Sequence, residues 1–186
     1  MRRLIALLAG LTALVAVSAP PSVGVAQAGS VERLVAPASA CPGAGPRAPA
    51  RAQEAAMLCL TNFARRHRGL APLDGSSKLD RAARLKSADI IRCDAFSHEA
   101  CGRDFTYWMQ RVGYIPEGCW RAGENIAWGT GSYATVRSIF GAWMRSAGHR
   151  ENILGSFSEI GIGLRVGGLE GNEGAHVWTQ EFGSRC

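Results

Sequence analysis

Two histidines and one glutamate have types and settings that could support chemistry. His98 ends the short motif FSH, His149 follows a glycine, and Glu124 lies inside the run RAGENIAWG, residues 121–129. Two neutral imidazoles together with solvent can bind zinc. Glu124 could orient one imidazole or act as a base on a metal-bound water. The other interpretation is a polar network in which both histidines only fix loop positions.

Residues 121–129 are too short and too rich in flanking glycine for a stable helix, so we expect a strand. A carboxylate in such an apolar strand is costly to bury unless partners satisfy it. The neighbouring Ser97-His98-Glu99 does not predict a serine hydrolase, because a triad is defined by geometry in space. The sequence also has no GxSxG and no HExxH motif.

The N-terminus has the pattern of a secretory signal peptide, which we place at residues 1–28. Two arginines precede a 14-residue apolar run, residues 4–17, and Ala26-Gln27-Ala28 fits a cleavage site. An uncleaved anchor is the alternative, but the run is shorter than the ~20 residues of a membrane-spanning helix. We therefore expect export and cleavage of this segment. No later stretch of the sequence is apolar enough to cross a bilayer.

The remaining 158 residues, 29–186, suit one domain with a sizeable core. Residues 29–52 are rich in Ala, Pro and Gly, which predicts a flexible lead tethered only at Cys41, and the domain proper is 53–186. Removing the two signal arginines lowers the net charge from +6 to +4. The other arginines are scattered among acids, so we expect no nucleic-acid partner.

All six cysteines follow the predicted signal, and an even number in an exported chain indicates three disulfides. Fifteen pairings are possible, and spacing alone does not choose among them. Proximity in sequence favours Cys41–Cys59 and Cys93–Cys101, which leaves Cys119–Cys186.

Hydrophobic periodicity predicts helices first and strands later. We expect helices over 53–69, 76–92, 104–113 and 132–146, with Gly148-His149 ending the last one and a further turn at 152–154. Strands are expected at 121–129, 160–166 and 176–182, with a turn over 167–174. This order predicts an α+β sandwich in which helices cover an antiparallel sheet.

Four segments, taken in this order and spacing, resemble the CAP superfamily of secreted proteins, which includes cysteine-rich secretory, antigen 5 and pathogenesis-related 1 proteins. The segments are FSHEA (96–100), AGENIAW (122–128), SAGHRENIL (146–154) and HVWTQEFG (176–183). The similarity covers 55–183 and is greatest to small secreted bacterial members of the SCP-like extracellular type. It implies a three-layer α-β-α sandwich with a central antiparallel sheet, and a cleft of two histidines and acids that in some members holds a divalent metal such as zinc.

By motif position the resemblance implies His98 and His149 as the metal ligands and Glu124 as the strand acid of that cleft. The family's second acid corresponds to Ser146, so the acid pair is incomplete in this sequence. Glu151 or Glu159 could replace it. Trp120 is expected at the rim of the cleft.

The resemblance therefore predicts a secreted CAP-domain protein that acts as a non-catalytic binding module. The expected ligand is a lipid or sterol-like molecule, a cell-envelope component or a protein partner, and no residue is assigned to catalysis. The alternative is a metal-dependent, peptidase-like hydrolase with His98 and His149 as ligands and Glu124 as base.

Overall fold

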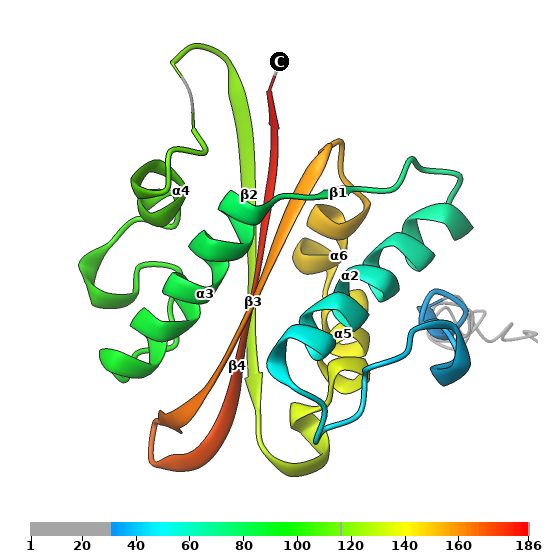
Figure 1. The fold of residues 1–186 in the computed structure, drawn as a ribbon, viewed down its shortest axis with the longest axis horizontal. Helices are drawn as coiled ribbons and strands as arrows, with labels where there is room; N and C mark the ends of the chain where they lie inside the picture. The colour runs from blue at the N-terminus through cyan, green and yellow to red at the C-terminus, as the bar shows by residue number, and fades with distance from the viewer. Residues whose placement is uncertain (1–30, 116, 186) are drawn as a thin grey trace, which may run out of the picture.

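Helices cover both faces of one central sheet in the computed structural model, which describes residues 31–115 and 117–185 (Figure 1). The predicted signal peptide lies outside these residues. The helices are α2 (Ala50–His67), α3 (Ser77–Arg92), α4 (Tyr107–Arg111), α5 (Val136–Arg145) and α6 (Ala147–Leu154), with short 3-10 turns η1 (Ala38–Ala40), η2 (Ala100–Gly102) and η3 (Gly131–Ala134). Within the described ranges, no helix is both long and apolar enough to cross a membrane.

The sheet has the strand order β1-β3-β4-β2, so that β2 lies at one edge. The strands are β1 (Asp74–Gly75), β2 (Trp120–Gly129), β3 (Glu159–Leu169) and β4 (Asn172–Arg185). The three long strands pair antiparallel, which confirms the predicted sandwich. β1 adds a two-residue parallel pairing with β3 that the pattern could not predict, because two residues show no alternation.

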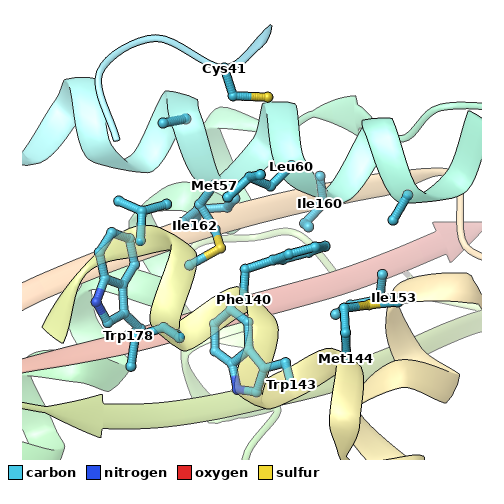
Figure 2. Packing of buried hydrophobic residues seen from close by; sticks show 14 of the residues in the cluster. Cys41, Met57, Leu60, Phe140, Trp143, Met144, Ile153, Ile160, Ile162 and Trp178 are labelled. Atoms are coloured by element: carbon cyan, nitrogen blue, oxygen red, sulfur yellow. The ribbon is translucent and has the colours of Figure 1, made fainter. Parts of the chain in front are cut away.

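The larger core lies between the sheet and the layer of α2, α5 and α6 (Figure 1). Met57 and Leu60 of α2 meet Phe140 and Trp143 of α5 over the strands (Figure 2). All four side chains are buried. Burial of side chains of this size contributes roughly 1.5–3 kcal/mol each, so this layer holds much of the fold's stability.

On the opposite face, β3 alternates glycine with large residues, and α3 packs against the glycines. Ile160 and Ile162 point into the larger core, whereas Gly161 and Gly163 face α3. A Cβ built on Gly161 would lie 2.0 Å from the backbone carbon of Leu79. The glycines thus let the α3 backbone pack directly on the strand.

The segment before α2 is held to the domain at more points than predicted. Leu34 and Ala36 are buried in the larger core, and Arg137 of α5 donates a hydrogen bond to the carbonyl of Ala36. The prediction that Cys41 alone tethers this segment is therefore wrong. The sequence of this segment shows no periodic hydrophobic pattern, because only a few of its side chains are apolar. Those few side chains are nevertheless enough to pack the segment against the domain.

Two predicted disulfides are confirmed, Cys41–Cys59 and Cys93–Cys101. The third pairing ends on Cys186, which is outside the described residues, and stays a prediction. The prediction that Gly148-His149 ends a helix is wrong, because both residues lie in α6. The chain bends instead at Ser146, whose extended backbone separates α5 from α6.

Candidate functional site

His98 and Glu124 meet although they lie on separate elements. His98 belongs to the loop between α3 and α4, and Glu124 to the middle of β2. The His98 Nδ1 atom is 2.6 Å from Glu124 Oε1, and the side chains are 53% and 1% exposed respectively. In the neutral imidazole Nδ1–H donates to the carboxylate, which leaves Nε2 as the basic nitrogen of the ring.

The loop that carries His98 is fixed by a buried carboxylate, Asp89, near the end of α3. Asp89 accepts hydrogen bonds from Arg92, Arg103 and the indole of Trp108, at 2.6, 2.6 and 2.8 Å. The Cys93–Cys101 disulfide closes the same loop. The position of His98 is therefore set by covalent and ionic contacts on both sides.

Lys86 of α3 provides a buried positive charge next to Glu124. Its Nζ lies 3.7 Å from Glu124 Oε1, and it donates a hydrogen bond to the carbonyl of His98. The Lys86 and Glu124 side chains are only 3% and 1% exposed. A buried ion pair of this kind is destabilising if either partner is removed alone, because the remaining charge stays desolvated.

A second carboxyl group, that of Glu181, lies beside Glu124. The two residues are direct cross-strand partners in the β2–β4 pairing, and Glu181 is fully buried. Burial, then the negative charge of Glu124 and a hydrogen bond to it, raise the pKa of Glu181 well above its usual range, while Lys86 opposes the shift. With both groups ionised, Glu124 Oε2 and both Glu181 oxygens have no hydrogen-bond partner among the described residues. A proton on Glu181 supplies the missing donor, so we describe the pair as one ionised and one neutral carboxyl group.

His149 lies near this cluster, at the start of α6. Its carbonyl accepts a hydrogen bond from Asn125, the residue after Glu124. Burial, and then the charge of His98, lower the pKa of His149. The lowered pKa favours the neutral form of His149 at physiological pH.

Two hydrogen bonds join α5 and α6 to the backbone of β2. Asn152 Nδ2 donates to the carbonyl of Glu124 at 3.2 Å, and Trp143 Nε1 donates to that of Ile126 at 3.1 Å. Together they hold α5 and α6, the second of which carries His149, against the strand that carries Glu124. We refer to His98, Glu124 and His149, with Lys86 and Glu181 beneath them, as the His98 site.

The other predicted site residues contribute less to this cluster. Ser146 is half-buried at the junction of α5 and α6. Trp120 is 37% exposed and lies four residues before Glu124, about 13 Å along the strand. Neither Glu151 nor Glu159 fills the place of a second acid, because Glu151 is exposed and Glu159 accepts a hydrogen bond from Tyr114.

Sequence reasoning missed Glu181 and the role of Lys86. Glu181 was visible only as an acid inside the alternating run HVWTQEFG, and its partner depends on the register between β4 and β2. Lys86 was visible only as a cation at the edge of the apolar face of α3.

The residues of the His98 site do not fit a resident divalent metal. No group of three or more His, Cys, Asp and Glu suited to a metal occurs within 31–115 and 117–185. Glu124 already interacts with Lys86 and His98, and the ammonium of Lys86 repels a second cation. Only two imidazoles remain as donors, one fewer than the protein supplies to a typical catalytic zinc.

The protonation of Glu181 predicts how stability depends on pH. Because its pKa is raised in the folded protein, folding takes up a proton, and stability falls as pH rises from about 4.3, the value in unfolded chains, towards the folded-state pKa. Glu181→Gln cannot titrate at this position. The free energy of unfolding of the variant minus that of wild type should therefore rise by about 1.4 kcal/mol per pH unit in that window. Urea unfolding at several pH values measures this, with the exposed Glu151→Gln as control. A difference from wild type that does not vary with pH would contradict the neutral state of Glu181.

The fold and this site together define a class of protein, a three-layer sandwich domain in which a glutamate on an edge strand pairs with a histidine from the loop after α3. A sequence model described as the cysteine-rich secretory protein family matches residues 58–182. The chain belongs to this family, the CAP family.

Known proteins agree with this assignment. The chain is 37% identical over 134 residues to the Bacillus subtilis protein YkwD, covering 70% of this chain and 47% of YkwD. A solved extracellular protein containing an SCP domain from Bacillus anthracis superposes with a TM-score of 0.59 at 25% identity, covering 74% of this chain and 44% of that one. An outer surface protein of Borrelia burgdorferi shares the fold with a TM-score of 0.57 at 16% identity, over 70% of this chain and 90% of that one. The chain thus spans about half the length of the first two proteins.

Proposed function

We propose that this chain is an exported, non-catalytic binding module that uses the surface around His98 to recognise a cell-envelope component or a protein partner. The observation that carries the proposal is the state of Glu124. Its charge is paired with that of Lys86, it accepts a hydrogen bond from His98, and the proton on Glu181 supplies a further hydrogen bond to it. A carboxylate held in this way orients His98 and is poorly suited to act as a base.

Export is supported by three independent features. The first 28 residues have the pattern of a signal peptide, and four of the described cysteines form two disulfides, which persist in oxidising compartments. Two structural neighbours are described as an extracellular protein and an outer surface protein.

The accessible part of the proposed surface consists of His98 and the neighbouring Phe96. Both are exposed on a loop that Asp89 and the Cys93–Cys101 disulfide hold in place. An aromatic side chain on a rigid loop loses little conformational entropy on binding, which suits it to anchor a partner.

We expect Phe96→Ala and His98→Ala to weaken sedimentation of the mature protein with isolated cell walls at least tenfold each, because anchor residues contribute about 2 kcal/mol or more. Val166→Ala is the matched control, since Val166 is 56% exposed on β3 and lies outside the His98 site. Equal sedimentation of all four proteins would contradict a recognition surface around His98.

The alternative function is a metal-dependent hydrolase, and a separate experiment distinguishes it from the binding module. Metal analysis should find less than one equivalent of zinc. A broad hydrolase screen should find no turnover that depends on Glu124, which is tested by comparing wild type with Glu124→Gln. Stoichiometric zinc together with turnover that depends on Glu124 would overturn the binding module in favour of the hydrolase.

A further inference from the structure

Exposed arginines gather at the C-terminal end of α2, in a part of the sequence that carries no acid. Residues 55–73 contain neither Asp nor Glu, and the end of α2 and the residue after it supply Arg66, His67 and Arg68. All three side chains are exposed. The dipole of a helix favours cations at its C-terminal end, so these residues alone do not indicate a ligand.

A further arginine reaches the same place from a different segment. Arg33 precedes the buried Leu34, and these two residues line a cavity of about 190 Å³ together with His67 and Arg68. The helix dipole does not account for Arg33, because this residue lies outside α2. The family match covers 58–182, so one wall of the cavity comes from a part of the chain that precedes the match.

These arginines have no acidic partner within the described residues. The side chains of Arg33, Arg66 and Arg68 form neither a hydrogen bond nor an ion pair with any residue in 31–115 or 117–185. The neighbouring Arg65 differs, because it is buried and donates hydrogen bonds to backbone carbonyls of the loop after α2 and the end of α6. Arg65 therefore stabilises the fold, whereas the three exposed guanidinium groups repel one another and are available to an anion.

Two guanidinium groups from separate segments suit a tetrahedral oxyanion. A carboxylate presents its two oxygens in one plane, and the fork of a single arginine satisfies both. A phosphate presents oxygens in several directions, so Arg33 and Arg68 can both donate to it in the cavity that they line. The cavity is smaller than the roughly 300–1,000 Å³ of sites for whole small molecules, which suits it to one phosphate of a larger ligand.

The exposure of these cations favours a polymer with many phosphates over a single phosphate. An ion pair at an exposed surface is weak, so tight binding needs several contacts within one ligand. Arg66 does not line the cavity but lies at the same end of α2, where a second phosphate of a chain can contact it. Nucleic acid is disfavoured, because no Phe, Tyr or Trp among the described residues lines the cavity as a platform for bases.

We propose that the C-terminal end of α2 binds a base-free phosphodiester polymer of the cell envelope, with one phosphate in the cavity lined by Arg33 and Arg68. The proposal adds a second binding surface, with its own ligand class, to the proposed function. It rests on the proposed export of the chain, and it does not depend on the surface around His98.

Isothermal titration of the mature protein with soluble polymers tests the proposal. Poly(glycerol phosphate) is the base-free phosphodiester, polyglutamate of equal charge supplies carboxylates, and single-stranded DNA of equal charge supplies phosphodiesters with bases. We expect poly(glycerol phosphate) to bind at least about fivefold more tightly than polyglutamate, and at least as tightly as DNA. Absence of binding, a smaller preference over polyglutamate, or tighter binding of DNA would overturn the proposal.

A single repeat of the polymer, glycerophosphoglycerol, tests whether several phosphates are needed. It should bind at least about tenfold more weakly than the polymer, because it lacks the additional contacts of a chain. An affinity closer to that of the polymer would indicate a site for a small phosphodiester and would overturn the polymer assignment.

Two variants test whether the cavity is the site. Arg33→Met and Arg68→Met should each weaken binding of poly(glycerol phosphate) at least about threefold, and each should lower the slope of log affinity against log salt by about 1. Arg111→Met is the matched control, because it removes an exposed arginine of α4, on the opposite side of the sheet from α2 (Figure 1). Melting curves establish that each variant is folded.

Unchanged affinity in either cavity variant, or an equal loss in Arg111→Met, would overturn the assignment of the polymer to this cavity. The titration uses pure polymers and variants of arginines outside the His98 site. Its failure is therefore distinguishable from a failure of the cell-wall experiment, which depends on Phe96 and His98.

Discussion

Lys86→Met should lower the free energy of unfolding by about 3–5 kcal/mol at neutral pH, the usual cost of removing one member of a buried ion pair. Methionine fills nearly the same volume but leaves Glu124, which is 1% exposed, without its buried cation. It also removes the hydrogen bond to the carbonyl of His98, so the His98 loop should loosen as well. Urea unfolding at constant pH measures the loss.

A double-mutant cycle separates loss of the charge pair from a simple packing defect. In the Lys86→Met background, Glu124→Gln removes the charge that was left unpaired, so it should cost less there than in wild type. Equal costs in the two backgrounds, or a loss below about 1 kcal/mol for Lys86→Met alone, would mean that the ion pair does not stabilise the site.

Gly163→Ala should destabilise the protein by at least about 3 kcal/mol, at the upper end of the cost of overpacking. A Cβ on Gly163 would lie 2.3 Å from the backbone carbon of Ala83, so relief requires a shift of α3 as a whole. The shift would also move Lys86, one turn further along α3, away from Glu124. The expected result is a lower melting temperature together with a lower urea midpoint.

Gly148→Ala is the control for this prediction. Gly148 lies in α6, and a Cβ there would have no neighbouring atom within 4 Å. Alanine has a higher helix propensity than glycine, so this variant should be neutral or more stable by up to about 1 kcal/mol. Similar losses at Gly148 and Gly163 would indicate that close packing of α3 on β3 is not the cause.

The elements that carry the site could be predicted because their periodicity is local. The run of apolar positions in α3 and the alternation of β3 each depend on a few neighbouring residues, and both appear as expected. His98, Glu124 and His149 could be grouped because their flanking motifs resemble a known family.

The chemistry beneath His98 could not be predicted, because it depends on contacts between distant segments. Glu181 is 57 positions from Glu124, and only the register of β4 against β2 makes them neighbours. The resemblance places the family's second acid at Ser146, whereas in the structure the second carboxyl group beside Glu124 is that of Glu181, on a different strand. Lys86 is a counter-ion on α3, and the glycines of β3 leave room for that helix to pack directly on the sheet.

The position of β2 at the edge of the sheet has a consequence for self-association. An edge strand presents unpaired backbone groups to which a strand of another molecule can add. Along β2 the carbonyls of Glu124 and Ile126 are already occupied by Asn152 and Trp143. The contacts that hold the site together thus also block part of this edge against strand addition and aggregation.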